Sequence, residues 1–153
     1  MNDLLEQLLQ EEQELQFTHF NEETAWQIGT WLVEYAIHNK LPITIDIQRG
    51  DHQLFHASRP GTSPDNDEWV KRKVRLVKRF GHSSFYIGRL LASQNKTISE
   101  KYLVSENEYA PHGGCFPIII KDTGIIGTIT VSGLPQAEDH KVVVQALRQY
   151  LGK

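Results

Sequence analysis

A chain of 153 residues with 39% apolar and 23% charged residues has the size and composition of one globular domain, which we expect to span residues 1–153. Its net charge of −3 argues against a general attraction to nucleic acid or to an anionic membrane. The acidic N-terminus and the lack of an apolar run of roughly 18 residues argue against a signal peptide and a membrane span. The one cysteine, Cys115, excludes an internal disulfide and favours the cytoplasm.

The first part of the chain predicts two helices and a β-hairpin. Leucines at helical spacing predict a short amphipathic helix over residues 4–15. Asn21 is a good N-cap for a second helix that ends near residue 38. Apolar and polar residues then alternate over residues 43–48 and 53–57, and the turn between them completes a hairpin.

The second part predicts further helices and a second hairpin. The helices are expected over residues 67–80 and 83–94, and a last helix starts at Pro135. Residues 100–114 have a weak pattern that ends in a tight turn, and strands follow over residues 115–121 and 125–131. Two hairpins without strand–helix–strand alternation indicate an α+β fold with an antiparallel sheet.

The predicted helix over residues 67–80 divides into a basic arc and an apolar arc. The basic arc contains Lys71, Arg72, Arg75, Lys78 and Arg79. It is typical of a solvated face, with an anionic partner as the alternative. Lys73 falls inside the apolar arc. Either its ammonium snorkels to an edge or to a carboxylate, or it is a ligand-facing cation that grips a carboxylate or phosphate.

The segment from Ser132 to Pro135 joins the last predicted strand to the last helix. Backbone N–H groups from Gly133 onward can hold an anionic group at the helix N-terminus. The alternative is a plain connection in which Ser132 caps the helix.

No zinc-binding pattern is present among the seven histidines, so the sequence gives no confident metal site. His112, beside Gly113, is the best candidate for an axial ligand or an acid/base. His52 and His56 are expected on the same face of their strand if that strand is regular. A buried, unreactive thiol is the default expectation for Cys115.

Two motifs, Gly-Gly-x-Phe-Pro-Ile at residues 113–118 and Ser-Gly-Leu-Pro-Gln at residues 132–136, give the sequence a family resemblance. Together they resemble the HbpS/GlcG-like superfamily of haem-degrading-type domains, and in particular its short bacterial and fungal branch. The resemblance implies a profilin-like α/β/α sandwich with an antiparallel sheet of about five strands, a homo-oligomer (a dimer or a larger ring), and haem or corrinoid binding in some members. The motif positions that it implies for the fold or a pocket are Gly113, Gly114, Phe116, Pro117, Ser132, Gly133, Pro135 and Asp139.

Three hypotheses about function follow. The first is a small-ligand-binding protein that binds or degrades haem or another tetrapyrrole. Its candidate ligand-binding residues are Lys73, His112, Gly113, Gly114, Ser132, Gly133 and Pro135. The second is a scaffold that binds a partner through the basic arc or through the leucines of the first helix. The third is an enzyme acting on a small carboxylate or phosphate, with Lys73 as the anion holder and His112 as the acid/base.

Overall fold

The computed structural model describes residues 2–153, which form six helices and four strands. In chain order these are α1 (Asn2–Glu14), α2 (Glu22–Asn39), β1 (Thr44–Arg49), β2 (His52–Ser58), α3 (Pro64–Phe80), α4 (Ser84–Ser93), α5 (Ile98–Tyr102), β3 (Cys115–Ile120), β4 (Gly124–Ser132) and α6 (Gln136–Leu151). The helices and strands lie close to the predicted ranges, with α5 added inside the weak stretch.

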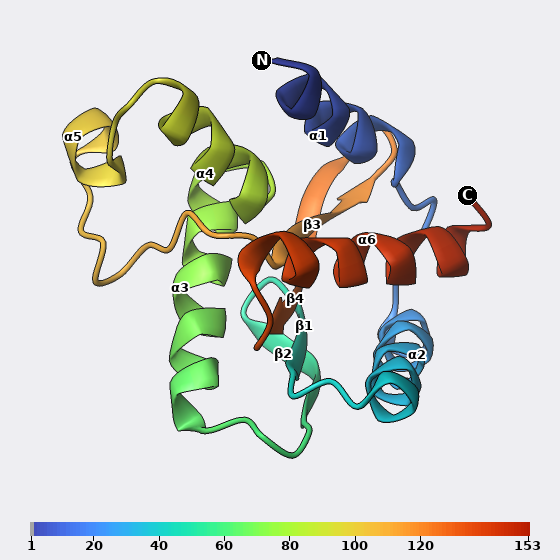
Figure 1. Ribbon diagram of the computed structural model, residues 1–153. Coiled ribbons are helices and arrows are strands. Elements are labelled where there is room, and N and C mark those ends of the chain that lie inside the picture. The colour runs from blue at the N-terminus through green and yellow to red at the C-terminus, as the bar shows by residue number, and fades with distance from the viewer. Residues whose placement is uncertain (1) are drawn as a thin grey trace.

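The strands form one antiparallel sheet in the order β2-β1-β4-β3, and helices cover both of its faces. Figure 1 shows α2 and α6 together on one side and α3 on the other, with α1 and α4 at one end. This arrangement confirms the α+β class and the layered sandwich. The sheet has four strands rather than about five. Beyond β3, the described residues 2–153 add only an isolated bridge between Phe17 and Ile120.

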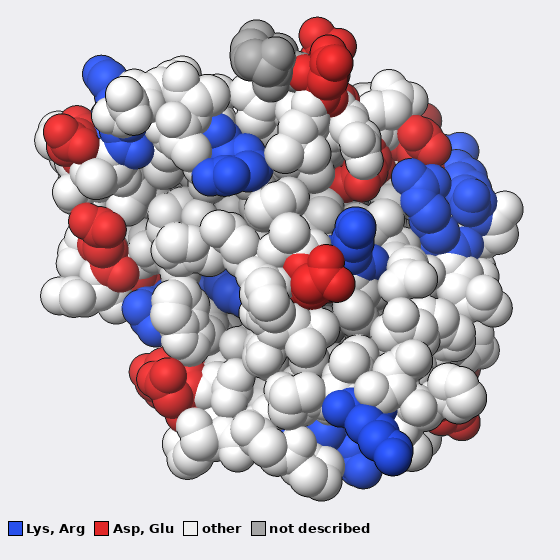
Figure 2. All heavy atoms as spheres, viewed as in Figure 1, with Lys and Arg blue, Asp and Glu red and all other residues white. Residues whose placement is uncertain are grey.

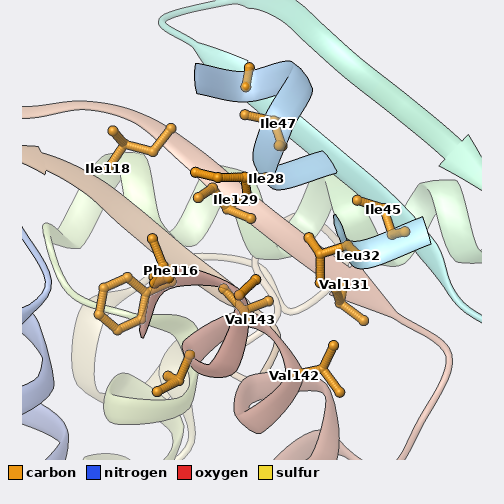
Figure 3. Close-up of a cluster of buried hydrophobic side chains, with 14 of the residues drawn as sticks. Ile28, Leu32, Ile45, Ile47, Phe116, Ile118, Ile129, Val131, Val142 and Val143 are labelled. Atoms are coloured by element: carbon orange, nitrogen blue, oxygen red, sulfur yellow. The ribbon is translucent and has the colours of Figure 1, made fainter. Parts of the chain in front are cut away.

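The main core lies between the sheet and the layer formed by α2 and α6. Alternate strand residues, among them Ile45, Ile47, Ile129 and Val131, are fully buried there. Figure 3 shows these side chains meeting Ile28 and Leu32 of α2 and Val142 and Val143 of α6. Burial of this continuous apolar surface is the main driving force for folding.

The opposite face of the sheet is polar although it is also buried. Thr44 and Asp46 of β1 and Thr128, Thr130 and Ser132 of β4 are at most 3% exposed. They occupy the positions that alternate with the apolar core residues, and α3 packs over them. Polar side chains under a helix need hydrogen-bond partners, so this layer is where sites for ligands are to be sought.

The start of α3 differs from the prediction. The helix begins at Pro64 rather than near residue 67, because Ser63 and Asn66 form a capping box and Pro64 takes the first helical position. The earlier start brings Asp65 and Asn66 into the first turn of α3. By contrast, the predicted cap Asn21 of α2 is confirmed, with Thr24 completing its capping box.

The expectation that His52 and His56 share a face is wrong. The register between β1 and β2 shifts at Gln48, so Leu54 is an extra residue in β2. His56 therefore lies opposite Asp46 on the α3 face, and its Nδ1 is 3.0 Å from the Asp46 carboxylate. His52 lies opposite Arg49 on the other face.

Charged side chains of both signs are interspersed on the face seen in Figure 2, without one large patch of a single sign. Among residues 2–153, no helix combines the length and the hydropathy needed to cross a membrane.

Candidate functional site

A pocket of about 360 Å³ opens where the first turns of α3 and α6 meet the end of β4. Its lining residues are Asp65, Asn66, Trp69, Lys73, His112, Ser132, Gly133, Leu134, Gln136 and Asp139. The fold thus brings together four of the predicted site residues, namely Lys73, His112, Ser132 and Gly133. The other three predicted site residues, Gly113, Gly114 and Pro135, do not line the pocket.

Lys73 forms a buried ion pair with Asp139, and the two side chains are only 4% and 3% exposed. The Lys73 ammonium donates to Asp139 Oδ2 at 3.2 Å and to the Val131 carbonyl oxygen at 3.2 Å. Burial lowers the pKa of Lys73 and raises the pKa of Asp139 to about 6, against the opposing effect of each partner's charge. The Lys73 ammonium thus reaches a carboxylate, as one of the two predicted alternatives has it, and it also lies on the pocket wall, so a ligand-facing role stays a prediction.

The connection that leads into α6 is held by a carboxylate of α6 itself. Asp139 accepts hydrogen bonds from the Leu134 N–H at 2.9 Å and from the Gly133 N–H at 3.4 Å. The prediction that the Gly133 N–H is free for a ligand anion is therefore wrong. Ser132 does not cap the helix either, because Pro135 is the N-cap and no side chain bonds there. The Ser132 hydroxyl instead accepts from Asn66 Nδ2 at 3.3 Å.

The two glycines of the Gly-Gly motif allow the close packing behind the pocket. Gly114 has φ +135, and a Cβ there would collide with the Val131 carbonyl oxygen and lie 2.6 Å from Lys73 Nζ. The Gly113 N–H donates to Gln136 Oε1 at 2.9 Å, and a Cβ on Gly113 would collide with the Gln136 backbone. These glycines therefore hold Lys73 and Gln136 in place.

His112 lies at the exposed rim of the pocket. Its ring meets the Trp69 indole edge-on at 5.7 Å, and the Arg72 guanidinium lies 4.2 Å from the centre of the same indole. Partial burial, together with the positive charges of Lys73 and Arg72, lowers the pKa of His112. The neutral imidazole, which can accept a proton or ligate a metal, is therefore favoured.

The sequence did not predict several of the residues that line the pocket, and it did not predict the role of Asp139. Asp139 was named only as a motif position, although a carboxylate in the first turn of a helix commonly binds free N–H groups. Asn66 was detectable as the third residue after the cap Ser63. Trp69 and Gln136 carried no local signal, because their importance depends on contacts across the fold.

The surfaces of the scaffold hypothesis are largely engaged within the chain. Each residue of the basic arc of α3 contacts another group of the chain: Lys71 contacts Glu68, Arg72 the Trp69 ring, Arg75 the Glu108 carbonyl oxygen, Lys78 Asp51, and Arg79 the Tyr109 ring. On α1, Leu8 is 1% exposed whereas Leu4 is 40% exposed, so the leucine face packs only in part against the body of the protein. Residues 2–153 contain no group of three or more side chains arranged to hold a metal ion.

Cys115 is completely buried under α3, and burial raises the pKa of its thiol to about 12. The thiol is therefore not a nucleophile at neutral pH, as the sequence interpretation expected.

Comparison with known proteins places the chain in a family. The family model described as haem degrading protein HbpS-like matches residues 20–148. A UPF0303 protein of Streptomyces coelicolor is 43% identical over 147 residues, covering 96% of this chain and 93% of the relative. The crystal structure of the Ybr137w protein has a TM-score of 0.90 at 35% identity, covering 97% of this chain and 87% of that one.

A more distant structure shares the fold alone. It is described as a PduOC:heme complex, and it has a TM-score of 0.68 at 15% identity, covering 84% of this chain and 92% of that one. The family match spans most of the chain, and the relatives match it almost end to end. The protein therefore belongs to the HbpS-like family, together with the UPF0303 proteins to which it is similar.

Proposed function

We propose that this protein binds a small polar molecule in the pocket between α3 and α6. The observation that carries the proposal is the buried ammonium of Lys73 on the pocket wall. An ammonium has three donors, and among residues 2–153 only Asp139 and the Val131 carbonyl oxygen accept from it. A buried donor without a partner is costly, so an acceptor atom of a bound molecule would complete its hydrogen bonds.

The size and lining of the pocket support a small polar ligand. Its volume of about 360 Å³ lies at the lower end of the range for small-molecule sites. Trp69 and Leu134 provide apolar surface, whereas amide, hydroxyl and charged groups make up most of the remaining lining. A few polar groups converging in a concave site are typical of specific ligand recognition.

The proposal is tested by mapping backbone and indole NMR shifts during titration with small amides, alcohols, amines and carboxylates. At least one compound should shift Gly133, Leu134 and the Trp69 indole together. Binding should weaken by about 10-fold or more in the double variant Lys73→Met/Asp139→Asn, which removes both buried charges. Lys71→Met, at the exposed salt bridge to Glu68, is the matched control. Shifts confined to other surfaces, or unchanged binding in the double variant, would contradict the proposal.

Haem is a second candidate ligand, supported by His112 and by the family description. The pocket interior does not fit a porphyrin, because its mostly polar lining offers little surface for an apolar macrocycle. His112 lies at the rim instead. The His112 imidazole has a lowered pKa and, among the described residues, no hydrogen-bond partner, so one ring nitrogen is available as an axial ligand.

Haemin titration followed by absorption spectroscopy tests this second candidate. We expect a saturable Soret shift that is lost in His112→Ala and kept in His38→Ala, because His38 is an exposed histidine of α2 that does not line the pocket. A Soret shift that persists without His112, or no shift at all, would reject haem ligation by this residue.

We also propose that residues 1–153 act as one cytoplasmic domain that assembles into a homo-oligomer. The single, buried cysteine supports a reducing compartment. An apolar patch that includes Trp26 supports assembly, because this residue is 58% exposed and lies 5.8 Å from the Phe55 ring. Light scattering should give a multiple of 17.5 kDa that falls in Trp26→Glu. A monomeric wild-type protein would reject assembly.

A further inference from the structure

The charges of the pocket disfavour a simple anion as its ligand. Lys73 contributes one positive charge, whereas Asp65 and Asp139 each contribute a negative charge. Desolvation and the nearby positive charges lower the pKa of His112, which favours its neutral form at pH 7. The lining therefore carries a net charge of −1, and a phosphate or a bare carboxylate would meet repulsion from two acidic side chains.

Two side chains of the pocket lining nevertheless have free hydrogen-bond donors. Gln136 uses its Oε1 to accept from the Gly113 N–H, which directs its Nε2 group away from that contact. Among residues 2–153 nothing accepts from Gln136 Nε2, and the third Lys73 donor is likewise unused. The free donors of Lys73 and Gln136 suit a carboxylate, which offers several acceptor sites.

A free acceptor lies in the exposed part of the lining. Asp65, in the first turn of α3, is solvent-exposed. Its backbone N–H donates to the Ser63 hydroxyl at 3.3 Å, whereas no described residue donates to its carboxylate. A ligand ammonium is the complement of this unpaired charge. Trp69 and Leu134 supply the apolar surface for a short side chain.

We propose that the pocket selects a small zwitterion of the α-amino carboxylate class, with its carboxylate toward Lys73 and Gln136 and its ammonium toward Asp65. This inference rests on the proposed function, because it names the ligand class of the same pocket. It explains how an anionic group can enter a pocket of net negative charge, since the ligand brings its own positive charge.

Three probes of nearly the same shape test the class. L-Valine carries both charges, L-valinamide lacks the carboxylate, and isovalerate lacks the ammonium. Affinities are measured at pH 7 from the NMR shifts of Leu134 and the Trp69 indole. We expect L-valine to bind about 10-fold or more tightly than either analogue. L-Valinamide offers a neutral acceptor in place of a charged one, and isovalerate leaves the Asp65 carboxylate without a charged partner.

Two conservative variants assign the ends of the ligand. Gln136→Glu keeps an oxygen for the Gly113 N–H, but it removes two donors and adds a negative charge, so it should abolish the preference of L-valine over L-valinamide. Asp65→Asn removes the unpaired carboxylate and should abolish the preference of L-valine over isovalerate. Glu68→Gln, an exposed change outside the pocket, should alter neither preference.

The outcomes separate this inference from the proposed function. If the analogues bind as tightly as L-valine, the pocket binds small molecules but the zwitterion class is wrong. If L-valine shifts no pocket residue while another compound does, the class is again wrong and the proposed function stands. If no compound of any kind shifts the pocket residues, both proposals fail.

Discussion

The buried ion pair between Lys73 and Asp139 gives a quantitative prediction for stability. Lys73→Met leaves Asp139 inside the protein with only the two N–H groups of Gly133 and Leu134 as partners. Removing one member of a buried pair typically costs about 3–5 kcal/mol. The rise of the Asp139 pKa from 3.8 to about 6 already corresponds to about 3 kcal/mol of stability lost at neutral pH, and loss of the Lys73 charge should raise this pKa further.

The double variant Lys73→Met/Asp139→Asn should recover most of that loss. Asparagine keeps an oxygen for the Leu134 N–H, and neither buried charge remains to be desolvated. We therefore expect the free energy of unfolding of the double variant to lie within about 1–2 kcal/mol of the wild type. This loss is much smaller than the sum of the losses in the two single variants. The direction in which stability changes with pH also follows from the raised pKa of Asp139. Because the folded state binds the Asp139 proton more tightly, the cost of ionising Asp139 is present above pH 6 and is relieved as pH falls toward 3.8.

Urea unfolding followed by circular dichroism measures these differences. With a slope of about 2 kcal/mol per molar urea, a loss of 4 kcal/mol lowers the midpoint by about 2 M. Lys71→Met, which breaks an exposed pair with Glu68, should change the unfolding free energy by less than about 1 kcal/mol. If Lys73→Met alone were as stable as the wild type, or if the double variant lost the full sum, the argument from burial would be refuted.

Three further predictions concern other parts of the chain. Hydrogen bonding to Glu12 raises the pKa of His82. The stability from this pair is therefore present below pH 6.5 and is lost as pH rises through the pKa of the folded state. Glu12→Gln should lower the free energy of unfolding, measured in urea, by more at pH 6 than at pH 8.5. Cys115 should resist a thiol reagent at pH 8 until the protein is unfolded; rapid labelling of the native state would contradict its burial. Gly114→Ala should destabilise the protein by about 2 kcal/mol more than Gly124→Ala. Both glycines have positive φ, but of the two only Gly114 has neighbours within reach of a Cβ. Equal losses in thermal or urea unfolding would show that the clash is relieved.

Periodicity and capping predicted most elements because these signals are local. The cap Asn21 and the two arcs of α3 depend on residues within a few positions of one another, so the chain itself displays them. The bulge at Leu54 could not be predicted, because it is a property of the pairing between β1 and β2 rather than of either strand. The fifth strand was expected from the family resemblance, and at its place beyond β3 Phe17 forms an isolated bridge to Ile120.

Only part of the candidate site could be predicted from the sequence, because only part of it gives a local signal. Lys73 attracts notice because it interrupts an apolar arc, which is a local anomaly. Its partner Asp139 lies 66 residues away in sequence, and nothing near Asp139 indicates that it faces a buried ammonium. The Gly-Gly motif was assigned to ligand binding, whereas Gly113 and Gly114 act by allowing Gln136 and Lys73 to approach the backbone.

The layered fold explains why the pocket forms at this place. Lys73 comes from α3 on one face of the sheet, and Asp139 comes from α6, which belongs to the layer on the other face. The two can meet only past the end of β4, where the chain leaves the sheet through Gly133 and Leu134 to enter α6. A pocket opens at that edge, so polar groups held by both helical layers are still open to a ligand. A binding site there uses positions that the two helical layers already fix, which is the preorganisation that specific recognition needs.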